Sequence, residues 1–245
     1  MGASQEDLYR EARGLLRRLG LMEMAREVGR AWLVGSVPLK LIVKPDIDVH
    51  VLVGEGPRHR GLRQAQGKRA RSLFPERPSG CFAEKVPGTF SLSKGGIEAP
   101  EVDAALAIAR QLMERRGVRK LEMLRFLFRD AVKVGFDQRV GGRTWHVDVW
   151  VTADPDHLGV GPTRWVRRRL TPGLRRAIMR LKRHYAARDM CRYGMSAELY
   201  RAVIEAGVRT PRQFLEYART HELSYRDALD LLEADARGVT SSFGT

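Results

Sequence analysis

The stretch from residue 31 to residue 53 decides the fold, and it reads AWLVGSVPLKLIVKPDIDVHVLV. Its first apolar run ends in the small pair Gly35-Ser36, and its second apolar run opens with Asp46 and Asp48. Side chains alternate between the two faces of a strand. We therefore predict that the two aspartates lie on one face of a strand and that the aliphatic residues between and after them lie on the other.

Two carboxylates on the same face of one strand favour a bound cation. Like charges at this spacing repel each other unless a cation lies between them. Ligands that offer only oxygen suit Mg²⁺ or Mn²⁺, which commonly take one or two carboxylates together with substrate phosphates. We therefore expect Asp46 and Asp48 to bind a divalent metal, and we interpret His50, on the same face, as a structural residue.

A second alternating stretch, RTWHVDVWVT at 143–152, places His146, Asp148 and Trp150 on one face of another strand. The pair Gly141-Gly142 before it is typical of a turn, so we predict a hairpin with the strand that precedes this pair. If this strand is the neighbour of the first, Asp148 can join Asp46 and Asp48 in a site with three carboxylates. We interpret His146, like His50, as a residue that supports the site rather than one that reacts.

Over roughly residues 30–152 this arrangement resembles the DNA polymerase β-like nucleotidyltransferase superfamily. The shared pattern is a Gly-Ser pair, a carboxylate–x–carboxylate triplet that enters a strand, and a third carboxylate inside a later strand. The resemblance implies an α+β fold, with a small mixed β-sheet nucleotidyltransferase core flanked by helices and a helical region after it. The chain departs from the pattern in the long insertion between Asp48 and Asp148.

The resemblance also implies a reaction, the transfer of a nucleoside monophosphate from an NTP to a hydroxyl group with release of pyrophosphate. In that scheme Mg²⁺ or Mn²⁺ ions about 3.5–4 Å apart neutralise the phosphates and activate the hydroxyl. The implied catalytic and metal-binding residues are Asp46, Asp48 and Asp148. Asp148 is also the implied general base, with Asp130 and Asp137 as the next candidates for its place.

The same resemblance assigns contacts to the nucleotide. Relatives bind nucleotide phosphates with the backbone and hydroxyl of the Gly-Ser pair, here Gly35 and Ser36. They often hold the outer phosphates with a lysine from the helical part of the chain, and Lys182 is our candidate for it.

The pattern along the chain predicts two domains. Residues 1–160 are expected to form the nucleotidyltransferase-like catalytic domain, with an insertion at about 54–99 that is rich in Gly, Pro and Arg. Residues 161–245 are expected to form a helical domain, and Pro155 and Pro162 mark a linker at the boundary.

The net charge of +15 arises from two short segments. Residues 58–71 contain six Lys and Arg residues and no acid, and residues 164–183 contain nine and no acid. Clustering of this kind indicates an anionic partner, and basic segments supply affinity for RNA or other nucleic acid without reading its sequence. The alternative is that both segments are solvated arginine-rich surfaces.

The charge also ranks the possible acceptors. A nucleic-acid end is slightly favoured, a small uncharged hydroxyl compound remains open, and a cationic aminoglycoside is disfavoured because arginines would repel it. The rival hypothesis is a non-catalytic protein that binds nucleic acid or nucleotide and keeps the nucleotidyltransferase fold.

The remaining features concern the cellular compartment. No run of 18 apolar residues predicts a membrane span, and the N-terminus lacks the layout of a signal peptide. Cys81 and Cys191 have neither metal-ligand spacing nor the number that a disulfide framework needs. We therefore expect a cytoplasmic protein, whose oligomeric state the sequence leaves open.

Overall fold

The structure is a computed structural model that describes residues 4–54, 84–85, 100–126, 131–188, 190–191, 194–221 and 232–233 of the 245. Two compact units make up the chain, Met1–Thr163 and Arg164–Thr245. The basic segment 58–71, Asp130 and most of the expected insertion lie outside the described residues.

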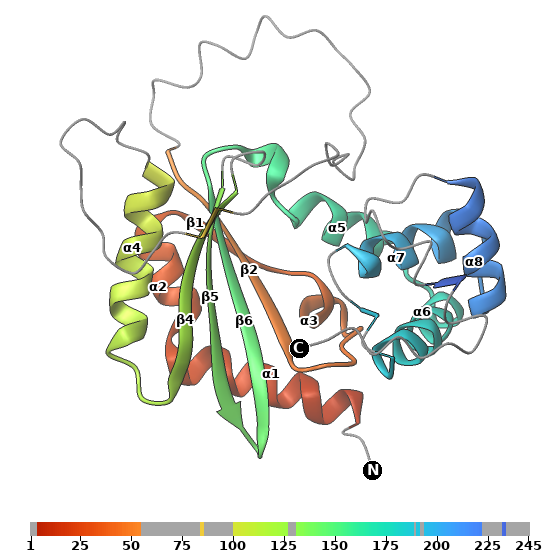
Figure 1. Ribbon diagram of the computed structural model, residues 1–245, viewed down its shortest axis with the longest axis horizontal. Coiled ribbons are helices and arrows are strands. Elements are labelled where there is room, and N and C mark those ends of the chain that lie inside the picture. The colour runs from red at the N-terminus through yellow and green to blue at the C-terminus, as the bar shows by residue number, and fades with distance from the viewer. Residues whose placement is uncertain are drawn as a thin grey trace, which may run out of the picture. The chain divides into compact units, whose positions relative to one another are not determined.

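The first unit is built on a six-stranded mixed sheet with the order β1-β2-β6-β5-β4-β3 (Figure 1). Strands β2 and β6 are parallel, and all other neighbours are antiparallel. The strands are β1 (Arg30–Val34), β2 (Asp46–Leu52), β3 (Glu84–Lys85), β4 (Val118–Phe126), β5 (Ala131–Val140) and β6 (Arg143–Thr152). The predicted α+β class, with a mixed sheet flanked by helices, is confirmed.

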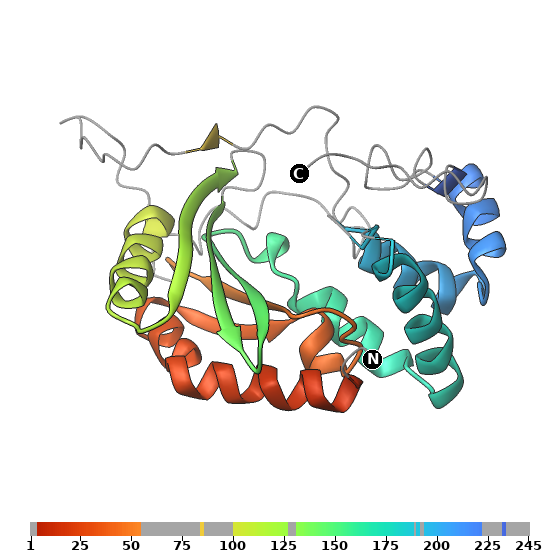
Figure 2. The ribbon, with the colours of Figure 1, turned by 60° about the horizontal axis from the view of Figure 1, so that its bottom comes forward.

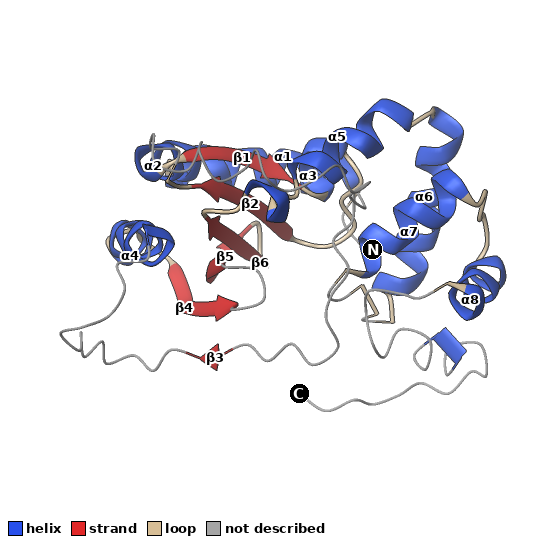
Figure 3. Cartoon of the chain, turned by 90° about the horizontal axis from the view of Figure 1, so that it is seen from above, coloured by secondary structure: helices blue, strands red, loops and turns tan. Residues whose placement is uncertain are grey.

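Helices cover one face of this sheet. The helices of the first unit are α1 (Gln5–Leu19), α2 (Leu21–Val28), the single-turn α3 (Ser36–Leu39) and α4 (Pro100–Met113). Helix α4 packs beside β4 and β5, and α2 packs on β1 and β2 (Figure 3). The predicted alternation holds on this side, where the valines and isoleucine of β2 and β6 are fully buried among the apolar residues of α1, α2 and α4.

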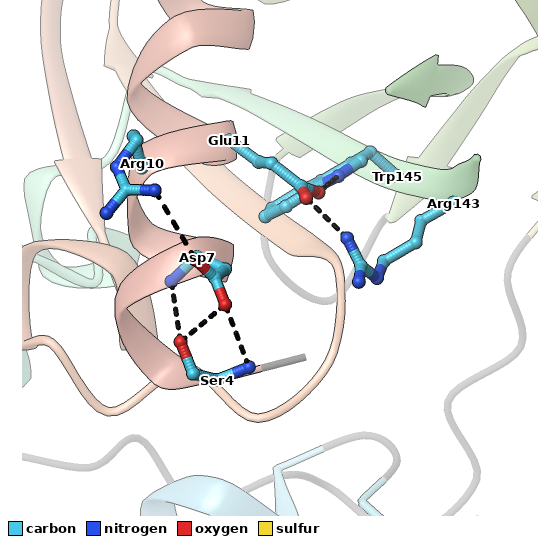
Figure 4. A network of polar contacts seen from close by, with 6 residues as sticks. All are labelled: Ser4, Asp7, Arg10, Glu11, Arg143 and Trp145. Carbon is cyan, nitrogen blue, oxygen red and sulfur yellow. Dashed lines mark hydrogen bonds and ion pairs between the residues drawn. The ribbon is translucent and has the colours of Figure 1, made fainter. Parts of the chain in front are cut away.

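Helix α1 begins at a capping box, in which Ser4 and Asp7 satisfy each other's backbone N–H groups (Figure 4). The helix crosses below the strands in Figure 2. Glu11 ties it to β6, because its carboxylate accepts a hydrogen bond of 3.1 Å from Nε1 of the buried Trp145 and pairs with Arg143. The N-terminal helix is therefore fixed to the strand that carries Asp148.

The tight turn between β5 and β6 sets the register of the candidate site. Gly141 and Gly142 have φ angles of +56° and +81°, and two successive positive values are the requirement of the commonest two-residue hairpin turn. The turn aligns Val140 with Arg143, so that Gly135 lies opposite Asp148. The hairpin predicted from the Gly-Gly pair is confirmed.

The second unit is helical in its described part. Its helices are α6 (Pro172–Ala186), α7 (Met195–Glu205) and α8 (Pro211–Thr220), and α5 (Val160–Arg169) spans the boundary between the units. Helices rather than an irregular linker occupy the region of the two prolines. Pro155 starts a 3₁₀ turn, and Pro162 lies in the first turn of α5, where its missing N–H costs no helical hydrogen bond.

Among the described residues, no helix combines the length and the apolar character needed to cross a membrane.

Candidate active site

The sheet face opposite the helices carries charged side chains from three adjacent strands. Asp48 of β2 and Asp148 of β6 are direct partners in the parallel pair, and Asp46 is the partner of His146. The structure therefore brings the third predicted carboxylate beside the first two, as expected if these strands are neighbours.

The Gly35-Ser36 turn lies against the same carboxylates. Gly35 has a φ of +70°, and a Cβ atom built on it would lie only 2.6 Å from Oδ2 of Asp48. Its N–H donates a hydrogen bond of 3.1 Å to Oγ1 of Thr163. Both the backbone angle and the contact therefore require glycine at this position. Ser36 follows as the first residue of α3.

The side chains of Asp46, Asp48 and Asp148 form a carboxylate row across strands β2 and β6. Each end of this carboxylate row has a cation of the chain beside it. Nζ of Lys44 lies 3.2 Å from Oδ2 of Asp46, and the lysine side chain is half exposed. At the other end, Oδ1 of Asp148 lies 3.2 Å from Nζ of Lys133 and 3.1 Å from Nε2 of His146. Burial alone would raise the pKa of Asp148, but His146 and Lys133 outweigh it and leave that pKa below its usual value.

His146 bridges two carboxylates. Its Nδ1 lies 3.0 Å from Oδ1 of Asp137, on the side away from Asp148. The contact with Asp148, more than that with Asp137, raises the pKa of His146 to about 9 against the effect of its partial burial. The imidazole is therefore a cation at neutral pH, and its contacts with two carboxylates fit the supporting role predicted for His146.

Asp137 has a further partner in Lys120, whose Nζ is 3.2 Å from Oδ2. Burial would raise the pKa of Asp137, but His146 and Lys120 hold it below its usual value. Lys120 reaches this position from a bulge in β4, where it has a positive φ of 51°.

This face also contains residues that we did not predict from the sequence. Lys133 and Gly135 of β5 alternate with Asp137 and so share its face, and Glu122 of β4 is the partner of Gly135. A Cβ atom on Gly135 would lie 3.3 Å from both the Asp148 and the Glu122 carboxylates, so that glycine leaves room for them to converge. A lysine and a glycine inside an apolar strand, AVKVGFDQRV, were the available signal.

His50 lies farther along the same face and anchors the chain after β6. Its Nδ1 accepts a hydrogen bond of 3.0 Å from the backbone N–H of Gly159, and its ring lies 6.3 Å from that of Trp150. These contacts fit the structural role predicted for His50.

Lys182, our candidate for a contact with the outer phosphates, lies on α6. It is buried within the second unit, where its Nζ donates a hydrogen bond of 3.1 Å to the hydroxyl of Tyr200. Contact with a nucleotide would require the side chain to leave this position, and its role there stays a prediction.

Asp46 and Asp48 suit a hard divalent cation, because they offer carboxylate oxygens and because Gly35 has no side chain to crowd the Asp48 carboxylate. Asp148 fits less well as a third ligand, since Lys133 and His146 already lie against it. Among the residues that the structure describes, no group of three or more His, Cys, Asp or Glu side chains is arranged to hold a metal ion. The repulsion expected between the acids is thus relieved in part by cations of the chain itself.

Comparisons of the chain with models of known protein families, with curated proteins and with solved structures find no match.

Proposed function

We propose that the protein is a metal-dependent nucleotidyltransferase, which moves a nucleoside monophosphate from an NTP to a hydroxyl acceptor and releases pyrophosphate. The observation that carries the proposal is the position of Asp48. Its carboxylate lies against the Gly35 turn on one side and in register with Asp148 on the other. This is the Gly-Ser and three-carboxylate pattern of the superfamily that the sequence resembles.

The chemistry needs little covalent help from the protein. Phosphoryl transfer depends mainly on in-line positioning and on neutralisation of charge. Asp46 and Asp48 are the residues that would hold Mg²⁺ or Mn²⁺, which supplies charge compensation for the triphosphate. By the resemblance, Gly35 and Ser36 contact the phosphates, and Asp148 orients the acceptor hydroxyl and receives its proton.

The acceptor we favour is a nucleic-acid end. Arginine side chains on α5 and α6 are solvent-exposed, and no acid lies among residues 164–183. The exposed arginines of this segment are Arg164, Arg167, Arg168, Arg169, Arg176, Arg180 and Arg183. A surface of this composition binds phosphates without regard to sequence.

A second candidate is a non-catalytic protein that binds nucleotide or nucleic acid. The observation in its favour is that Lys44, Lys133 and His146 lie within ion-pair distance of the acids. Asp46 and Asp148 are therefore already compensated by cations of the chain and do not by themselves demand a metal, so activity has to be measured directly.

The deciding experiment is incubation with each α-labelled NTP, Mg²⁺ or Mn²⁺, and a pool of RNA or of small metabolites. We expect label on an acceptor, and we expect Asp46→Asn and Asp48→Asn to abolish it. Asp103→Asn, an exposed change on α4, is the matched control and should retain full transfer. Absence of label with every NTP and both pools would favour the binding protein.

The class of the acceptor can be tested by measuring how its binding affinity depends on salt concentration. For a nucleic acid, log affinity falls linearly with log salt concentration, with a slope set by the number of phosphates engaged. Replacing Arg167, Arg168 and Arg169 by Gln should lower that slope and spare NTP binding. Replacing Arg13, Arg17 and Arg18, which are exposed on α1, makes the same charge change elsewhere and should leave the slope unchanged. Salt-independent activity would favour a small hydroxyl compound.

A further inference from the structure

Lys133 is a buried cation of the charged face that the proposed reaction does not use. It lies in β5, and only 10% of its side chain is exposed. Its Nζ is 3.2 Å from Oδ1 of Asp148 and 3.9 Å from Oε1 of Glu122. An ammonium group is costly to bury unless opposite charges compensate it, and these two carboxylates do so.

The strand is shaped for this contact. Gly135 follows Lys133 on the same face, and the absence of a side chain there lets the Asp148 and Glu122 carboxylates approach each other over the backbone. Any larger residue would separate them. The lysine therefore lies beside two acids that the glycine brings together, and it supplies Asp148 with the positive charge that a second cation would otherwise supply.

The two ends of the carboxylate row differ in how firmly they hold their cation. Lys44, beside Asp46, is half exposed, and water can replace it at little cost. Lys133, beside Asp148, is enclosed, and its departure would leave buried acids uncompensated. A divalent ion can thus displace the first lysine far more easily than the second.

We infer that Lys133 takes the place of a second metal ion. The site then binds one divalent ion, at Asp46 and Asp48, and Lys133 acts as a positioning residue that neutralises Asp148 and fixes its carboxylate. This inference rests on the proposed function, and it replaces the two-ion arrangement implied by the resemblance with one ion and one fixed ammonium group.

The test counts bound Mn²⁺ by electron paramagnetic resonance, on the full chain with a non-hydrolysable NTP analogue. We expect one ion per chain in the wild type and two in Lys133→Gln. A nearby like charge shifts such an equilibrium by about tenfold or more, so the second ion should bind at least about tenfold more tightly than in the wild type. Lys133→Arg keeps the cation and should restore a count of one.

Lys120→Gln is the matched control. Lys120 also lies 3.2 Å from an aspartate of this face, Asp137, but 83% of its side chain is exposed. Its loss should leave the count at one. If Lys133→Gln does not fold, the wild-type count still decides, because two ions in the wild type would overturn the inference.

The outcomes separate the inference from the function on which it rests. Two ions in the wild type, or one in a folded Lys133→Gln variant, overturn the role of Lys133 while metal-dependent transfer stands. No ion in the wild type, with the NTP analogue present, instead removes the support for a metal-dependent reaction.

Discussion

The two faces of strands β2 and β6 differ in chemistry, although alternate residues of the same two strands build both faces. On one face, isoleucine and valine of the two strands pair side by side and are fully buried, for example Val49 with Val149. On the other face, the partners are Asp48 with Asp148 and Asp46 with His146. Strand alternation places the two sets one residue apart along the chain.

This difference separates stability from function. Burial of each valine on the apolar face contributes about 1.5–3 kcal/mol, and the face as a whole holds the sheet to its helices. Ion pairs on the other face roughly balance the desolvation of their charges and contribute little net stability. The charged face is therefore not explained by folding, which directs attention to what it binds.

The largest effect should come from placing a charge on the wrong face. Val149→Asp would bury an unpaired carboxylate among Val132, Val134 and the other core residues, at a cost of at least about 4 kcal/mol. We expect loss of the folded state, measured by circular dichroism and urea unfolding. Asp48→Asn, one position away on the other face, should retain the wild-type midpoint. A folded Val149→Asp would show that this face is not the core.

The next effect is on catalysis. Asp148→Asn should lower turnover at least about 10²-fold, the usual result of removing a key charge-stabilising group, while NTP affinity stays nearly constant. Asp137→Asn, which removes the other carboxylate at His146, should cost less than about tenfold because Asp137 is the strand partner of His146 and not of Asp148. Steady-state kinetics well below the unfolding temperature would measure both. The reverse order would transfer the proposed role to Asp137.

Much of this arrangement could be predicted because strand alternation is a geometric rule. The alternation of apolar residues predicted that Ile47 faces the core and that Asp46 and Asp48 face away from it. The Gly-Gly pair at 141–142 predicted the hairpin that β5 and β6 form. The sequence also predicted that Asp148 lies beside Asp46 and Asp48 if their strands are neighbours, and the parallel pairing of β2 and β6 meets this condition.

The cations could not be predicted, because their positions depend on pairing between distant strands. Lys133 reaches Asp148 only through the register of the β5–β6 hairpin, and Lys120 reaches Asp137 only through the bulge in β4. Lys182 shows another limit. A long side chain at the edge of an apolar stripe can extend to water or turn inward to a polar partner, and here it turns to Tyr200.

A smaller effect should follow from filling the space over Gly135. An added methyl group would lie 3.3 Å from Asp148 Oδ1 and Glu122 Oε1, which is tight enough to push the carboxylates apart by a few tenths of an ångström. We expect Gly135→Ala to lower turnover about tenfold, since small misplacements are costly in catalysis, and to change stability by less than about 1 kcal/mol. Gly14→Ala, which meets nothing within 4 Å on α1, should be fully active and slightly more stable. Equal turnover in both variants would contradict the importance of this spacing.

The smallest effect concerns pH, and it contrasts the two faces directly. The folded-state pKa of His146, about 9, lies above the ordinary value of 6.5, so its stabilisation is complete below pH 6.5 and is lost as pH rises through 9. The low pKa values of Asp137 and Asp148 contribute stability that is lost only in acid, outside this window. Because 43% of the His146 side chain is exposed, solvent screening reduces the expected loss to about 1 kcal/mol.

Urea unfolding in EDTA between pH 6 and pH 10 would measure this loss. His146→Gln removes the titrating group, so the difference in unfolding free energy between wild type and variant should shrink with rising pH and level off above about 9. Val149→Ala, on the apolar face, should instead lower stability by the same amount at every pH, because no charge there titrates. A wild-type–variant difference for His146 that stays constant across the range would show that the imidazole is not held as a cation by Asp148 and Asp137, and the two faces would then share a stability that does not depend on pH in this window.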